Sequence, residues 1–146
     1  CWTIPGSRTK NGAEHIVHLS APAQAVLRDL GGDSPAEGLL FTTTGVTPIS
    51  GISKAKARLD KASGITDWRL HDFRRTAVTH MVDLGVNPAV ADRILNHVAA
   101  STMSVVQRTY QRLALIDQRR HALDAWADRV MQLAGGRATD NIVRLI

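Results

Sequence analysis

The stretch from residue 71 to residue 110 constrains the fold more than any other part of the chain. It carries His71 and His97, an arginine pair and the single tyrosine, and apolar residues recur between them at helical spacing. Short amphipathic helices bring such polar groups to one pocket only when their apolar faces pack over a common core. The sequence therefore predicts a core that contains Val78, Met81, Val82, Leu84, Val90, Ile94 and Leu95.

The polar residues of this stretch share the ability to hold a phosphate. The guanidinium of Arg74 offers a fork of donors, His71 and His97 donate or accept, and Tyr110 carries a potential oxygen nucleophile. Together they indicate phosphoryl transfer on nucleic acid. Taken one at a time, each also has a plainer explanation: a surface arginine beside a capping histidine, a histidine at a helix C-terminus, and a half-buried packing tyrosine.

Composition fits a nucleic-acid partner. A net charge of +5 and a pI near 10.1 favour a polyanion, and 146 residues suffice for one domain with a sizeable core. Cys1 is the only cysteine, and no Cys/His cluster has zinc-ligand spacing, so we expect no disulfide and no metal. No apolar run approaches the roughly 20 residues of a membrane span. No signal peptide opens the chain. Because the chain lacks an initiator Met and enters strand-like sequence at Trp2, we interpret it as a piece of a longer protein.

The remaining patterns predict a mixed, mainly helical α+β fold. Residues 1–5 and 14–19 have strand character around an Asn-Gly turn and predict a β-hairpin. Residues 39–42 predict a short buried segment. We expect one domain over residues 1–134, followed by a linker and an apolar tail over 135–146. Periodicity and helix-stop signals predict helices over residues 23–30, 50–63, 72–84, 88–97 and 117–134.

The basic residues outside the central stretch each have two interpretations. Lys10 lies near the hairpin tip, where a lysine is ordinarily solvated. The alternative is that its flexible ammonium reaches a phosphate site and donates a proton. The helix predicted over 50–63 poses the same choice between a solvated face and contact with a DNA backbone, through Lys54, Lys56, Arg58 and Lys61.

The turn at residues 85–88 supports a competing function. Two helices joined by a short turn that contains Gly are the outline of a helix-turn-helix, so residues 72–97 are also compatible with a non-enzymatic DNA-binding module that places Arg74 and Arg75 on DNA. A third possibility is a structural fragment that only keeps the fold. Lys10 and Tyr110 separate these alternatives, because a reader of base edges needs neither.

Four motifs together resemble the catalytic domain of the tyrosine recombinases, the phage integrase family. The resemblance extends to about Trp126 and implies a mainly helical α+β fold with a small sheet near the N-terminal side. The motifs are Thr9-Lys10-Asn11-Gly12 with His15-Ile16-Val17-His18-Leu19-Ser20, Leu70-His71-Asp72-Phe73-Arg74-Arg75-Thr76, Leu95-Asn96-His97, and Tyr110.

The resemblance also implies a reaction and a role for each residue. Tyr110 is the nucleophile, Arg74 a phosphate clamp, His71 and His97 supporting imidazoles, and Lys10 the general acid. The implied function is site-specific recombination, the integration or excision of a phage or mobile element, through a 3′-phosphotyrosine on double-stranded DNA. It uses no cofactor, no metal and no small-molecule substrate. The resemblance further implies a tetramer on DNA in a bacterial or phage cytoplasmic setting, at the nucleoid.

The chain departs from the family pattern at three points. Asn96 stands where the family often has glycine, and no residue matches the second catalytic arginine upstream of the hairpin lysine, since Arg8 lies on the hairpin itself. The N-terminal DNA-clamping domain is also missing. We therefore expect an N-terminally truncated catalytic domain that cleaves DNA poorly on its own.

Overall fold

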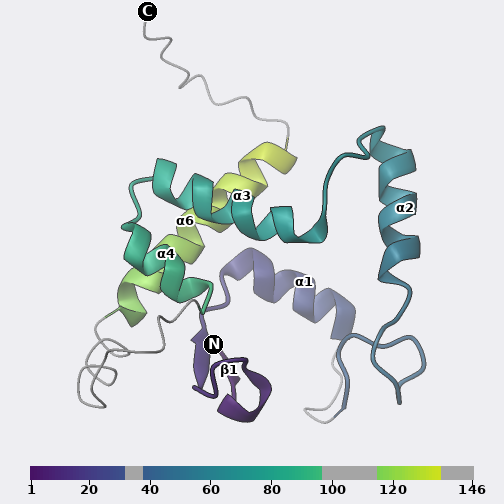
Figure 1. Ribbon diagram of the computed structural model, residues 1–146, viewed down its shortest axis with the longest axis horizontal. Coiled ribbons are helices and arrows are strands. Elements are labelled where there is room, and N and C mark those ends of the chain that lie inside the picture. Colours follow the sequence, from purple (N-terminus) through teal and green to yellow (C-terminus); the bar gives the residue numbers. More distant parts are fainter. Residues whose placement is uncertain (32–37, 97–114, 136–146) are drawn as a thin grey trace, which may run out of the picture.

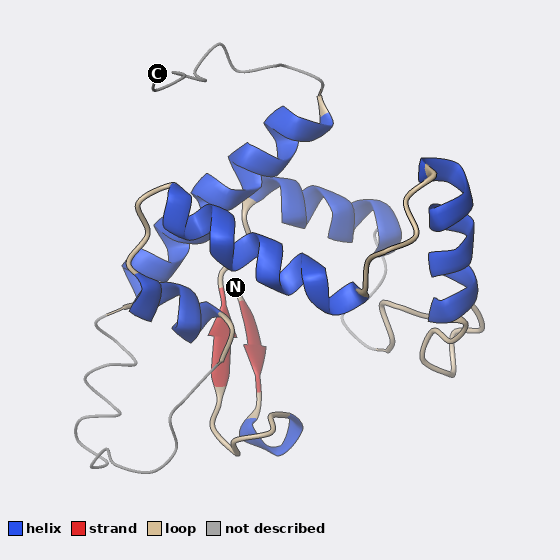
Figure 2. Ribbon diagram, turned by 45° about the horizontal axis from the view of Figure 1, so that its top comes forward, coloured by secondary structure: helices blue, strands red, loops and turns tan. Residues whose placement is uncertain are grey.

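The structure is a computed structural model that describes residues 1–31, 38–96 and 115–135. Figure 2 shows a mainly helical molecule with one small two-stranded sheet, which confirms the predicted fold class. In chain order the elements are β1 (Trp2–Ile4), a 3-10 turn η1 (Gly6–Arg8), β2 (His15–Val17), α1 (Ala21–Gly31), α2 (Ile52–Ser63), α3 (Leu70–Asp83), α4 (Pro88–Ile94) and α6 (Ile116–Ala134).

The N-terminal hairpin forms where the sequence predicted it. β1 and β2 pair antiparallel, with Trp2 opposite Val17 and Ile4 opposite His15. The connection folds back on itself so closely that a Cβ on Gly6 would lie 2.3 Å from the carbonyl oxygen of Gly12. Only glycine fits that approach, so the compact loop that carries Lys10 depends on a residue without a side chain.

The core lies between α3, α4 and α6, which cross one another in Figure 1. Met81, Val90 and Ala122 are each 2% exposed at its centre. The prediction was right for Met81 and Val90 and wrong for Val82 and Leu84, which are 41% and 47% exposed. Successive helical residues are turned by about 100°, so Val82 lies on a different side of α3 from Met81, and Leu84 follows the last residue of the helix as its C-cap. Ala77, Val86, Ile94, Leu115, Leu123 and Trp126 pack around the centre.

The turn between α3 and α4 contains the expected stop and start signals. Gly85 has a φ of 84°, and the amide N–H groups of Gly85 and Val86 donate to the carbonyls of Val82 and Met81, both at 2.9 Å. This pair of bonds is the Schellman arrangement that ends a helix. Asn87 then accepts a hydrogen bond from the Ala89 amide at 2.9 Å, so α4 is capped at its start. α4 ends at Ile94, three residues earlier than predicted.

α2 stands to one side of the other helices (Figure 1) and has no buried residue. The preceding apolar segment is exposed as well: Leu39, Leu40 and Phe41 are 43%, 43% and 53% exposed. The prediction of a short buried segment over 39–42 was therefore wrong, because none of the described elements packs over it closely enough. Within the described residues, no helix is long and apolar enough to cross a membrane.

Candidate functional site

A cavity of about 660 Å³ opens where the hairpin meets α3 and the end of α4. Three predicted site residues line it together: Lys10 from the hairpin, and His71 and Arg74 from α3. The other two, His97 and Tyr110, lie outside the described residues. The remaining lining residues are Ile4, Arg8, Thr9, His15, Val17, Ile94, Leu95 and Asn96.

The cavity has the charge expected of an anion site. Arg8, Lys10 and Arg74 bring positive charge from two parts of the chain, and none of the described lining residues is acidic. Lys10 and His71 are exposed, so both are accessible to a ligand. A wall with several cationic donors and no competing carboxylate suits a phosphodiester.

Arg74 is held toward the cavity by the turn that follows α4. Its Nη2 donates a hydrogen bond to the carbonyl oxygen of Leu95. The helix predicted to begin at residue 72, which would hold the arginine pair in its first turn, begins at Leu70 in the structure. The Asp72 carboxylate accepts the Arg69 amide at 2.8 Å, and the arginine pair lies in the second helical turn. A guanidinium carries five N–H donors, and the bond to Leu95 leaves others for a phosphate.

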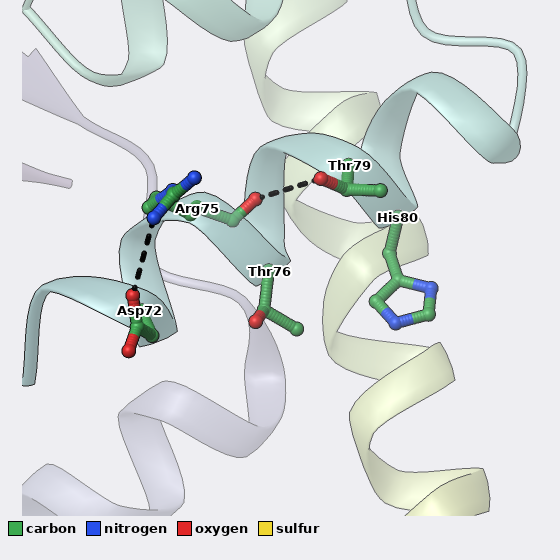
Figure 3. A pocket seen from close by; sticks show the side chains of 5 residues that line it. All are labelled: Asp72, Arg75, Thr76, Thr79 and His80. Carbon is green, nitrogen blue, oxygen red and sulfur yellow. Dashed lines mark hydrogen bonds and ion pairs between the residues drawn. The ribbon is translucent and has the colours of Figure 1, made fainter. Parts of the chain in front are cut away.

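Arg75 serves a different surface. A second hollow, of about 340 Å³, lies along α3 and is drawn in Figure 3, where Arg75 reaches back toward Asp72 with its Nη1 3.7 Å from the carboxylate. The Thr79 hydroxyl donates to the Arg75 carbonyl at 3.1 Å, and the His80 ring stacks on Trp126 at 5.6 Å. The neighbouring arginines thus line different hollows, and the joint DNA contact of the helix-turn-helix interpretation gains no support.

His15 is a buried part of the cavity wall, and no role was predicted for it. It is 9% exposed, and burial, followed by the positive charges of Arg119 and Arg74, lowers its pKa, while the backbone of Ile94 acts in the opposite direction. The imidazole is therefore neutral at neutral pH and adds no repulsion to the adjacent guanidinium. Its alternation with Val17 on β2, with both residues lining the cavity, is the sequence signal that could have identified it.

Two contacts join β2 and the residue that follows it to α6. Arg119 is buried, and its Nη1 donates to the Ile16 carbonyl at 3.3 Å. Burial and the nearby charge of Arg93 lower the pKa of Arg119. His18 and Asp124 form a second link, with 2.9 Å between Nε2 and Oδ1. These contacts join residues more than 100 positions apart, so no local pattern predicts them.

Asn96 has an unusual backbone and a specific partner. It is the one residue other than glycine among the described residues with a positive φ, 56°. Its side-chain oxygen accepts a hydrogen bond from Asn11 Nδ2 at 3.0 Å. The left-handed conformation gives a physical reason why glycine suits this position, and asparagine is among the residues that tolerate it best.

The described residues contain no group of three or more His, Cys, Asp or Glu side chains able to hold a metal ion.

Comparison with known proteins decides the family. The sequence model of the phage integrase family matches residues 1–114, a span that includes all five predicted site residues. The chain belongs to the phage integrase family. One relative, the prophage integrase IntA of Escherichia coli (strain K12), is 29% identical to this integrase-family chain over 137 residues. That alignment covers 92% of the chain and 32% of IntA, so the chain spans about a third of its relative's length. No solved structure matches it at a significant level.

Proposed function

We propose that this chain is the catalytic part of a tyrosine recombinase that performs site-specific recombination on double-stranded DNA. The observation that supports the proposal best is the single cavity shared by Lys10, His71 and Arg74, which come from chain segments more than 60 residues apart. A fold maintained only for structure has no need to gather these three groups. The recombined DNA would belong to a phage or mobile element undergoing integration or excision.

The proposed chemistry exchanges one phosphoester for another. The Tyr110 oxygen attacks the phosphorus of a DNA strand and gives its proton to one of the two imidazoles, His71 or His97. The bond to the 5′-oxygen breaks, and the Lys10 ammonium protonates that leaving oxygen. The products are a 3′-phosphotyrosine and a free 5′-hydroxyl. Attack by the 5′-hydroxyl of another strand reverses these steps and reseals the DNA, so no external energy source is needed.

Arg74 would stabilise the charge that develops on the phosphate oxygens during this exchange. The hydrogen bond to the Leu95 carbonyl supports the role, because a guanidinium already fixed by the protein needs little reorganisation when charge appears. A fixed donor of this kind typically contributes about 2.7–4 kcal/mol to transition-state stabilisation. His15 would assist by staying neutral beside Arg74, since a charged imidazole would repel the guanidinium.

The proposal extends to assembly and to the activity of the isolated chain. We propose that the complete recombinase acts as a tetramer on DNA in the cytoplasm, at the nucleoid, with no small-molecule substrate. The second arginine expected from the family resemblance has no match in this sequence. For that reason we propose that the 146 residues alone cleave DNA poorly. Because they span only about a third of the relative's length, we also propose that they bind DNA weakly.

The test is covalent capture. The full-length protein is incubated with a nicked suicide DNA, from which the 5′-hydroxyl fragment is lost so that resealing is blocked, and protein–DNA adduct is measured. The expected result is an adduct with the wild type and none with Tyr110→Phe, at nearly unchanged DNA affinity. Wild-type protein that binds DNA without any adduct would support the non-enzymatic DNA-binding alternative and contradict the proposal.

A further inference from the structure

The tip of the hairpin is linked to the turn after α4 by a hydrogen bond between two asparagine side chains. Asn11 Nδ2 donates to Asn96 Oδ1 at 3.0 Å, across 85 positions of sequence. Asn11 directly follows Lys10, and Asn96 directly follows Leu95, whose carbonyl accepts the bond from Arg74. The bridge therefore connects the loop that carries the lysine to the turn that fixes the arginine.

The orientation of the Asn11 amide is set by a second bond. Its Oδ1 accepts the Ala13 amide N–H at 3.1 Å, so Nδ2 is left as the donor that faces Asn96. The loop is also braced beside Lys10: the Thr9 hydroxyl lies 3.0 Å from the Gly6 carbonyl oxygen and 2.8 Å from that of Ala13. A hydroxyl has one proton, so it donates to one carbonyl at a time. The tip is thus a locally ordered loop whose position over the cavity depends on its outer contacts.

The backbone at Asn96 indicates that its side chain has a function. A φ of 56° suits glycine best, and an asparagine there accepts a less favourable backbone conformation. What the asparagine gains over glycine is the amide that Asn11 contacts. Both Lys10 and Asn96 line the cavity, so the bridge closes its rim at the place where a leaving 5′-oxygen would meet the ammonium.

We propose that Asn11 and Asn96 are positioning residues whose amide bridge holds the Lys10 loop over the cavity and thereby sets the rate of proton transfer to the leaving 5′-oxygen. The inference rests on the proposed recombinase function. It adds a link that the chemistry of the five site residues does not include. Neither asparagine touches the substrate; both act through Lys10.

The expected effect is modest because the bridge is exposed to water. One net hydrogen bond changes an equilibrium by about 2- to 12-fold, so losing the bridge lowers the closed population of the Lys10 loop by at most that factor. Cleavage limited by proton transfer should slow to the same extent. Cleavage that needs no proton from Lys10 should not slow at all, and this difference separates positioning from general stabilisation.

The experiment uses single-turnover adduct formation by the full-length protein at saturating DNA. Two suicide substrates are compared, one ordinary and one with sulfur as the 5′-bridging atom, whose thiolate leaves without protonation. Asn96→Gly removes the amide and keeps an unstrained left-handed backbone. Lys10→Ala serves as the reference for complete loss of the general acid.

We expect Asn96→Gly to slow cleavage of ordinary DNA about 2- to 12-fold, to cleave the sulfur substrate at the wild-type rate, and to lose nothing further in an Asn11→Ala background. An Asn96→Gly protein that cleaves ordinary DNA normally, or that slows equally on both substrates, would overturn the inference. Failure of the proposed function looks different: the wild type would form no adduct, or sulfur would fail to rescue Lys10→Ala.

Discussion

Replacing Arg74 by alanine should lower the stability of the fold and the rate of DNA cleavage while leaving DNA affinity nearly unchanged. The guanidinium is half-buried and donates to the Leu95 carbonyl, while its remaining N–H groups are left for a phosphate. The substitution therefore removes two interactions at once. One belongs to the folded protein and the other forms fully only in the transition state.

Each loss has its own magnitude. A hydrogen bond from a charged donor contributes about 1.5–3 kcal/mol, so the free energy of unfolding of Arg74→Ala should fall by about that amount. Removal of one fixed donor from an anionic transition state costs about 10²- to 10³-fold in rate. DNA affinity should change little, because Arg74 is one positive charge among the many that contact a DNA backbone.

The assay is single-turnover adduct formation on the nicked suicide DNA, with denaturant unfolding measured on the same preparations. Arg75→Ala is the matched control, because it removes the same side chain from the next position of α3. The Arg75 side chain is 76% exposed, and its Nη1 lies 3.7 Å from the Asp72 carboxylate in the other hollow. Exposed ion pairs contribute about 0–1 kcal/mol, so we expect near-normal stability and cleavage from this control. Arg74→Lys should retain charge but not the fork, and should fall between wild type and Arg74→Ala.

Two results would refute this reasoning. If Arg74→Ala cleaved within about threefold of the wild type, the guanidinium could not be one of the fixed donors that such a rate loss requires. If Arg75→Ala lost as much activity as Arg74→Ala, the division of the two arginines between separate hollows would have no functional meaning.

Three further outcomes follow from the fold and the site. Met81→Ala should lower the free energy of unfolding by about 2–5 kcal/mol in denaturant titrations, because Met81 is 2% exposed at the centre of the core; a loss below about 1 kcal/mol would contradict that assignment. The pKa of His15 is lower in the folded chain than its usual 6.5, so the unfolded chain binds more protons and stability falls as the pH drops through about 6.5; His15→Gln should make this decline shallower, and equal slopes would contradict the pKa shift. The 146-residue chain alone should bind DNA in a salt-sensitive way and form little adduct compared with the full-length protein; equal adduct yields would show that no further arginine is needed.

Local signals predicted the elements of this chain well. Gly85 and Pro88 mark the end of α3 and the start of α4, and Gly64 and Gly135 follow α2 and α6 as expected. These signals succeed because helix ends are determined by backbone conformations and unpaired amides within a few residues.

Burial was predicted less well. The apolar spacing of α2 indicated an inward face, yet Ile52 and Leu59 are 53% and 48% exposed. Periodicity shows that a helix has an apolar side but not which element covers it. For the same reason the spacing around Met81 placed Val82 in the core, although Val82 lies on a different side of α3 and is 41% exposed.

The candidate site was predicted in part. The motifs identified Lys10, His71 and Arg74, which line one cavity in the structure, and their catalytic roles stay predictions. The roles assigned to His97 and Tyr110 stay predictions, since both lie outside the described residues. The wall and rim around these residues were not predicted, because the burial of His15, the separate hollows of the two arginines and the Asn11–Asn96 bond all depend on contacts across the fold.

The most direct test of the central claim is to identify the amino acid that becomes attached to DNA. Adduct formed by the full-length protein on the suicide substrate is digested with nuclease and trypsin, and the nucleotide-bearing peptide is sequenced by mass spectrometry. Because Arg108 and Arg112 flank the tyrosine, the account predicts the peptide Thr109-Tyr110-Gln111-Arg112 with a 3′-linked nucleotide on the phenolic oxygen. A nucleotide on any other residue, or DNA bound without covalent attachment, would contradict it.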